Sequence, residues 1–212
     1  MNSLASLELD TTTTPKSVTQ TLDPFFNEEA TWPYQNNNNA TYIAELKSRW
    51  EPPMVFTYFG DSQFSWMFNN KKYYSSLVSF EKKDALKNEN QDIAQLFMFN
   101  QDRTIASISP ITIKKQNAKK SGIPFFLEVK AMAIAKATPD TMLIIIGYID
   151  SKKYLADPHG DLPESTSTIL LHFSDESGKL KIEQDDNCLG NPNKYSTIAG
   201  ARKALKQCLL KH

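Results

Sequence analysis

Alternating apolar and polar positions dominate the second half of the chain and predict antiparallel β-structure. Residues 125–136 and 141–151 are expected to form two long strands, joined by a short turn around Pro139. Residues 168–173 and 179–183 are expected to form a second hairpin around a turn that ends in glycine. Long antiparallel strands are therefore expected to form the body of the protein.

Shorter segments with strand character precede these hairpins. Phe64, Trp66 and Phe68 alternate with other residues and lie on one face of a predicted strand. Residues 104–113 are rich in β-branched residues and also alternate. Residues 92–99 could form a helix or a strand, because their apolar residues fit neither period clearly.

Helical spacing of apolar residues occurs at both ends of this strand-rich part. Between residues 40 and 50, apolar residues recur three and four positions apart, and Pro52 ends the predicted helix. A final helix is expected after Ser196 or Thr197, since either side chain can cap its N-terminus. The apolar stripe of this final helix consists of Ile198, Ala201, Leu205, Cys208 and Leu209.

The beginning of the chain has a different composition from the rest. The run Thr11–Thr14 shows no helical period, and the run Asn36–Asn39 cannot bury apolar surface. We therefore expect residues 1–35 to form a flexible N-terminal segment and residues 36–212 to form a single α+β domain. The expected architecture is a curved antiparallel sheet with N-terminal helices on one face and a C-terminal amphipathic helix.

Composition and charge narrow the class of protein. The 212 residues include 24 basic and 24 acidic side chains, so the formal net charge is zero and a globally basic nucleic-acid binder is not expected. Two cysteines do not make a disulfide-rich secreted scaffold. The chain contains no apolar run of membrane-spanning length, and its first residues do not resemble a secretory signal. An intracellular protein, in the nucleus or the cytoplasm, is expected.

The order of these elements resembles the nuclear transport factor 2-like superfamily. Residues 42–50, followed by residues 59–66, are similar to the early helix and first strand of that family. The pair of long strands is similar to its central hairpin, and residues 168–186 are similar to its last hairpin. The likeness covers roughly residues 40–190. The terminal helix after Asn193 and the strand-like residues 105–113 depart from the family pattern.

The resemblance implies a cone in which N-terminal helices sit against a strongly bent sheet. The superfamily includes binding modules, such as the mRNA export receptor and its small partner subunit, and also small dehydratases and isomerases with a polar pocket. The fold alone does not choose between these functions.

His172 is the best candidate for acid–base catalysis, because histidine titrates near neutral pH. It lies on a predicted strand, on the face opposite to its two apolar neighbours, with Asp150, Asp185 or Asp186 as possible orienting partners. The alternative is a strand histidine that faces solvent or is held by a structural hydrogen bond.

No metal and no cofactor are expected from the motifs. Asp157, His159 and Asp161 alternate in a loop, but this set makes a poor zinc site. The chain has no glycine-rich phosphate loop and no GxSxG nucleophile motif.

Two basic clusters could contact the phosphates of RNA or DNA. The first is a loop, and the second is the polar side of the final helix. Their residues are Lys114, Lys115, Lys119 and Lys120 in the loop, and Arg202, Lys203 and Lys206 in the helix. The alternative is that they are ordinary surface charges on a neutral protein.

The chain contains 12 Phe, 8 Tyr and 3 Trp, and aromatic residues are enriched at protein interfaces. A sheet face with Phe64, Trp66, Phe68, Met132 and Ile134 could dock a protein partner, unless helices of the same chain cover it.

The leading hypothesis is therefore a non-enzymatic protein-interaction module, self-associated or bound to a partner, and a nucleocytoplasmic transport complex is one assembly in which it could work. A small cofactor-free lyase or isomerase using His172, and a nucleic-acid-associated accessory subunit, are the alternatives.

Overall fold

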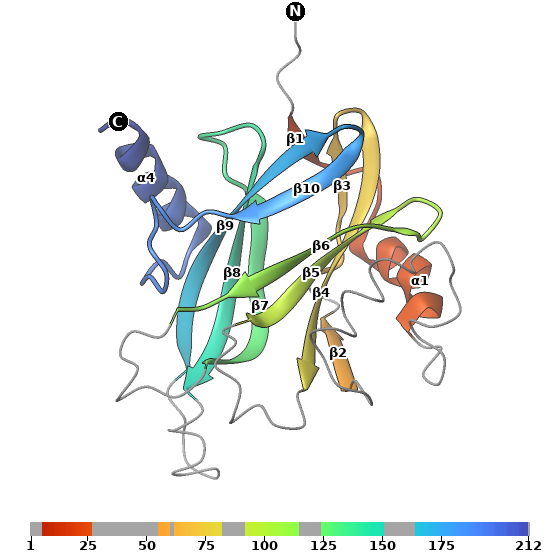
Figure 1. The fold of residues 1–212 in the computed structure, drawn as a ribbon, viewed down its shortest axis with the longest axis horizontal. Coiled ribbons are helices and arrows are strands. Elements are labelled where there is room, and N and C mark those ends of the chain that lie inside the picture. The colour runs from red at the N-terminus through yellow and green to blue at the C-terminus, as the bar shows by residue number, and fades with distance from the viewer. Residues whose placement is uncertain are drawn as a thin grey trace, which may run out of the picture.

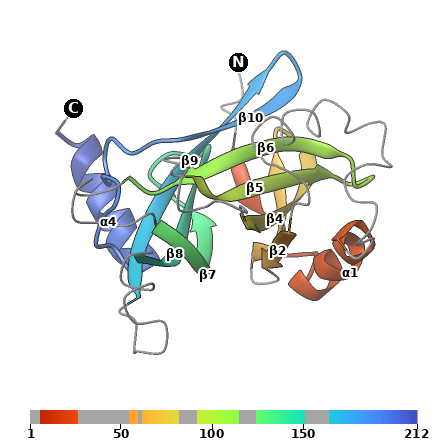
Figure 2. The same cartoon turned by 60° about the horizontal axis from the view of Figure 1, so that its bottom comes forward.

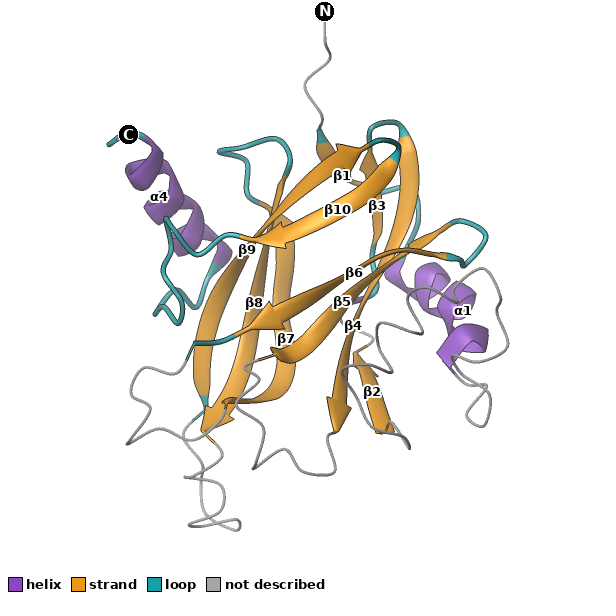
Figure 3. Ribbon diagram, in the orientation of Figure 1, coloured by secondary structure: helices purple, strands orange, loops and turns teal. Residues whose placement is uncertain are grey.

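The computed structural model shows two antiparallel β-sheets that face each other and, among the residues that it describes, one helix on the outer side of each sheet (Figure 1). It describes residues 6–26, 55–59, 62–81, 92–114, 124–150 and 164–211. Figure 3 shows that strands form the centre of this described part and that the two helices lie on opposite flanks.

The first sheet, sheet A, follows the order β1-β3-β4-β5-β6, and β2 pairs with the second half of β4. Its strands are β1 (Leu7–Leu9), β2 (Val55–Phe59), β3 (Ser65–Phe68), β4 (Lys71–Glu81), β5 (Asp92–Asn100) and β6 (Ile105–Thr112). Asn69 and Asn70 connect β3 to β4 with φ angles of 50° and 60°. Asparagine tolerates this conformation, so the two residues suit a tight hairpin turn.

The second sheet, sheet B, follows the order β10-β9-β8-β7. Its strands are β7 (Pro124–Ile134), β8 (Thr141–Asp150), β9 (Ser165–Glu176) and β10 (Lys179–Gln184). The β7–β8 and β9–β10 pairs confirm the two predicted hairpins. Gly178 adopts a φ of 83° in the second turn, as its position there predicted.

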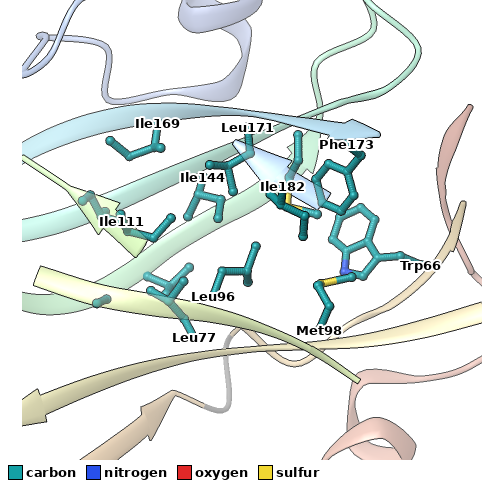
Figure 4. Packing of buried hydrophobic residues seen from close by; sticks show 14 of the residues in the cluster. Trp66, Leu77, Leu96, Met98, Ile111, Ile144, Ile169, Leu171, Phe173 and Ile182 are labelled. Atoms are coloured by element: carbon teal, nitrogen blue, oxygen red, sulfur yellow. The ribbon is translucent and has the colours of Figure 1, made fainter. Parts of the chain in front are cut away.

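The inner faces of the two sheets pack on each other and form the main core (Figure 4). The rings of Phe68 on β3 and Phe173 on β9 lie 5.9 Å apart and bridge the sheets. Further contacts across the core come from the residues labelled in Figure 4, which are Trp66, Leu77, Leu96, Met98 and Ile111 of sheet A and Ile144, Ile169, Leu171 and Ile182 of sheet B.

The edges of the sheets are linked by hydrogen bonds from side chains and from the backbone. The Gln184 side chain accepts from the Thr112 backbone N–H at 2.9 Å and donates to the Thr112 carbonyl at 3.0 Å, so it joins β10 to β6. The Ser109 hydroxyl donates to the Ile182 carbonyl between the same strands. On the other side, the Leu7 backbone N–H donates to the Pro139 carbonyl at 2.7 Å.

Two serines supply hydrogen bonds at the point along β4 where its neighbouring strand changes from β3 to β2. The Ser75 hydroxyl accepts from the Trp66 indole N–H at 2.9 Å and donates to the Ser62 carbonyl at 2.7 Å. The Ser62 hydroxyl accepts from the Leu77 backbone N–H at 2.6 Å. These bonds satisfy polar groups that are buried from water, which an interrupted strand would otherwise leave unpaired.

The described helices lie on the outer sides of the sheets. Helix α1 (Pro15–Phe26) lies on the side of sheet A that faces away from sheet B (Figure 2). Its Val18 and Leu22 are fully buried. Helix α4 (Ile198–Leu209) packs on the outer face of sheet B through Ala201 and Leu205.

The α+β class and the antiparallel sheets agree with the sequence analysis, but the architecture is two facing sheets rather than one curved sheet with helices on one face. Strand β1 and helix α1 lie within residues 1–35, where a flexible segment was expected. The predicted helix at residues 40–50 lies outside the described residues. Residues 92–99 form a strand whose ambiguous pattern has a physical cause, since both of its faces are covered.

Asp10 fixes the N-terminal strand to sheet A. Its carboxylate lies 2.7 Å from the Lys72 ammonium and accepts hydrogen bonds from Thr12, Thr13 and Ser65. The Lys72 bond, followed by those from the threonines, holds the pKa of Asp10 far below its ordinary value of 3.8. The carboxylate is therefore charged in the folded protein, and β1 is anchored through it.

We expect Asp10→Asn to lower the free energy of unfolding at pH 7 by about 1–3 kcal/mol, because charge-assisted hydrogen bonds are lost. Since the folded protein lowers the pKa of this group, its contribution is present above the ordinary value of 3.8 and is lost as the pH falls below it. Urea unfolding at pH 7 and pH 3 should therefore show a smaller difference between wild type and variant at pH 3.

Glu8→Gln, at an exposed carboxylate of the same strand, is the matched control and should change stability little at either pH. An Asp10→Asn variant as stable as wild type at pH 7 would contradict the anchoring role.

Candidate functional site

The predicted docking face is buried in the inter-sheet core. Trp66 and Phe68 are 0% and 1% exposed, and Phe64, Met132 and Ile134 pack partly buried against the same cluster. The expectation of an accessible aromatic face is therefore wrong here, and the cover is the second sheet rather than helices. The predicted shared face of Phe64, Trp66 and Phe68 is confirmed, because all three contact this core.

His172 lies on the outer face of β9, between two carboxylates. Its Nε2 is 3.3 Å from an oxygen of Asp185, and its Nδ1 is 3.9 Å from an oxygen of Asp140. Asp185 is one of the three orienting partners proposed from the sequence. Asp140 was missed, because only the pairing of Thr141 with His172 brings the β7–β8 turn beside this side chain.

The other two proposed partners do not contact His172 among the contacts that the structure describes. Asp186 accepts hydrogen bonds from Gln184 and Asn191 and pairs with the Lys114 ammonium at 2.9 Å. Burial alone would raise the pKa of Asp186, but these hydrogen bonds lower it below its ordinary value. The side chain of Asp150 lies outside the described residues.

The geometry of His172 suits a structural contact between two segments of the chain better than acid–base catalysis. A general acid or base needs a ring nitrogen within reach of a bound substrate. Both ring nitrogens of His172 face carboxylates, and the side chain is 37% exposed on the outer face of sheet B rather than enclosed between the sheets. Its contacts join the β7–β8 turn to the segment after β10.

The predicted phosphate-binding residues are not brought together as free cations. The Lys114 ammonium pairs with Asp186, and the Arg202 guanidinium donates to the Ile134 carbonyl through Nε at 3.1 Å and through Nη2. Lys115, Lys119 and Lys120 lie outside the described residues. Lys203 and Lys206 are exposed on α4, as predicted for the polar side of that helix.

The C-terminal end of α4 and the residue after it also carry exposed apolar side chains that sequence reasoning missed. Leu209 is 44% exposed and Leu210 is 77% exposed, the two highest values among large hydrophobic residues in the described ranges. We define the α4 surface as the exposed residues Lys203, Lys206, Leu209, Leu210 and Lys211. Leu209 had been assigned to the buried stripe, but the helix ends at this residue and leaves it beyond the edge of the sheet contact.

Charge is segregated onto this end of the chain. The sequence after Asp186 contains five Lys or Arg residues and no Asp or Glu. Residues 1–186 therefore hold all 24 acidic side chains but only 19 of the 24 basic ones. The zero net charge of the protein conceals a basic C-terminal element on an acidic body.

Several contacts fix α4 in place. The Thr197 hydroxyl accepts from the Gly200 backbone N–H at 3.1 Å and caps the helix, as predicted. Ala201 and Leu205 pack against Leu143 and Leu170 of sheet B. The Arg202 guanidinium adds its bonds to the β7 carbonyl. The helix is therefore held by its cap, its apolar side and a polar contact.

A disulfide bond between Cys188 and Cys208, with Cα atoms 5.6 Å apart, ties α4 to the segment after β10. The sequence did not predict this bond. One sequence feature could have indicated the bond: Cys208 lies on the apolar stripe of the helix, and this stripe faces the sheet. Disulfide bonds persist mainly in oxidising compartments. The expected location in the nucleus or the cytoplasm stays a prediction.

The described residues hold no group of three His, Cys, Asp or Glu side chains placed to bind a metal ion. Asp157, His159 and Asp161 lie outside those ranges. No helix in the described ranges has the length and apolar character needed to cross a membrane.

Comparison of the chain with known proteins finds no matching protein family, no curated relative and no similar solved structure. The geometry of this chain alone therefore carries the functional argument.

We expect Cys208→Ser to lower the free energy of unfolding by about 2–4 kcal/mol, the usual contribution of a disulfide bond. Urea unfolding without reductant measures this change. Wild-type protein in dithiothreitol should show the same decrease, and the double variant Cys188→Ser/Cys208→Ser should not respond to dithiothreitol. A wild-type unfolding midpoint that reductant does not change would contradict the contribution of the disulfide.

Proposed function

We propose that the chain is a non-enzymatic protein-interaction module that docks an acidic protein partner through the α4 surface. The observation that carries this proposal is the combination of two exposed leucines with three exposed lysines over the outer side of the firmly held α4 and the two residues that follow it. Exposed leucines supply apolar area to bury, and the lysines select a partner of opposite charge.

The state of the lysines supports this role. Lys72, Lys114, Lys130 and Lys181 each form an ion pair within the protein. Among the contacts of the described chain, none of the three lysines of the α4 surface has an acidic partner. Their charge is therefore available to a second molecule.

The mounting of the helix supports the same role. The disulfide bond and the contacts of Ala201, Arg202 and Leu205 hold α4 in one position against sheet B. A surface that is already ordered loses less conformational entropy when a partner binds. The leucines and lysines are thus presented in a fixed arrangement.

The same contacts disfavour the alternative partners. Two of the basic residues predicted to contact phosphates, Lys114 and Arg202, are engaged within the protein. The apolar side of α4 is covered by sheet B, so the helix cannot lay that side into a lipid bilayer. A symmetric dimer through the α4 surface would bring the lysines of two copies together.

A role in nucleocytoplasmic transport and membership of the nuclear transport factor 2-like superfamily stay predictions. The present proposal does not depend on either of them, because it rests on the charge and exposure of α4.

The proposal is tested by site-specific photo-crosslinking in extract of the native cell. A photoreactive residue at Gln207, which is exposed beside the α4 surface, should form a crosslink to an acidic protein. Leu210→Asp, and separately Lys203→Glu/Lys206→Glu, should reduce this crosslink and weaken binding of the purified partner about tenfold or more.

The control position for the photoreactive residue is Lys179, which is exposed as the first residue of β10. Lys179→Glu is the matched charge reversal and should leave the Gln207 crosslink unchanged. Equal crosslinks from both positions, or a crosslink that survives Leu210→Asp and the double charge reversal, would contradict the proposal. A nucleic-acid product that high salt abolishes would instead favour the accessory-subunit hypothesis.

A further inference from the structure

Three buried polar side chains lie in sheet A or immediately before strand β3. Gln63 and Ser76 are 0% exposed, and Gln95 is 1% exposed. Four of their atoms have no hydrogen-bond partner in the described part of the chain: Nε2 and Oε1 of Gln63, Oγ of Ser76 and Nε2 of Gln95.

Strand register places the three residues together. Ser76 pairs with Phe97 and Val78 pairs with Gln95, so Ser76 and Gln95 are diagonal neighbours on β4 and β5. Leu77, which follows Ser76, and Ala94 and Leu96, which flank Gln95, belong to the inter-sheet core, so Ser76 and Gln95 point outwards. Gln63 precedes Phe64, whose carbonyl accepts from the Ser75 backbone N–H, so Gln63 lies beside Ser76.

The surroundings of these side chains make unpaired atoms costly. Val78 and Phe97, which share this face, are fully buried and apolar. A buried polar group without a hydrogen bond is destabilising, and few such groups occur in native proteins. Ser62 and Ser75 show the usual outcome nearby, because the hydroxyl of each is hydrogen-bonded.

We infer that Gln63, Ser76 and Gln95 form a buried site that holds a small, neutral hydrogen-bonding guest. The unpaired atoms comprise two amide donors, one amide acceptor and one hydroxyl. None of them is charged, so the site is unsuited to an anion or a metal ion. A guest that both donates and accepts hydrogen bonds fits this set, either ordered water or a small solute with an amide or hydroxyl group.

The sign of a stability change tests the inference. The double variant Gln63→Met/Gln95→Met keeps the side-chain length and removes the amides. If a guest bridges the amides, the variant loses those hydrogen bonds and its urea midpoint falls below that of wild type. If the site is empty, the variant loses only unsatisfied groups and its midpoint rises, which would overturn the inference. Gln101→Met, at an exposed turn position, is the control for the chemical change itself.

Two measurements on the wild-type protein identify the guest and decide the matter if the variant does not fold. Cross-relaxation between water and the side-chain amide protons of Gln63 and Gln95 would identify long-lived water. An additional mass on the native protein, removed by denaturation, would identify a solute. Absence of both signals would overturn the inference. The proposed docking function of α4 stands or fails separately, since α4 lies on the other sheet.

Discussion

The packing of the two inner sheet faces on each other determines where every other group in the protein can lie. Trp66 and Phe68 from sheet A meet Phe173 and Leu171 from sheet B, and these side chains exclude water from the space between the sheets (Figure 4). Burial of apolar area of this kind is the main favourable contribution to folding. Once the inner faces are used in this way, binding chemistry is left to the outer faces, the turns and the helices.

The outer faces of the two sheets differ in the side chains that they carry. Sheet B is covered by α4, whose apolar side meets Leu143 and Leu170 and whose polar side keeps its lysines in water. Sheet A carries a different outer layer, in which the buried Phe97 and Phe99 lie on the same face as the buried polar residues Ser76 and Gln95. One outer layer therefore presents charge to the surroundings, and the other encloses neutral polar groups.

Sequence patterns predicted what depends on neighbours along the chain and missed what depends on pairing between distant segments. The β7–β8 and β9–β10 hairpins and the cap at Thr197 follow from local turns and periodicity, and the structure contains them. The burial of Trp66 could not be read in this way, because the covering residues belong to a sheet formed more than fifty positions later. Alternation alone shows that a strand has an apolar face and does not show what covers that face.

The candidate sites illustrate the same limit. Asp140 and His172 are 32 positions apart in the sequence, and only the register of β8 with β9 places them together. The Cys188–Cys208 pair likewise depends on how α4 lies against the sheet. By contrast, the segregation of basic residues after Asp186 is a property of the sequence itself, and counting charges by segment reveals it.

The Cys188–Cys208 bond has a consequence for how this protein tolerates damage to its backbone. It closes a covalent ring that contains the segment after β10 and nearly all of α4. A protease that cuts one peptide bond inside this ring leaves both pieces joined through sulfur. The basic end of the chain thus remains attached to its body after such a cut, and its loss requires a second cleavage or a reductant.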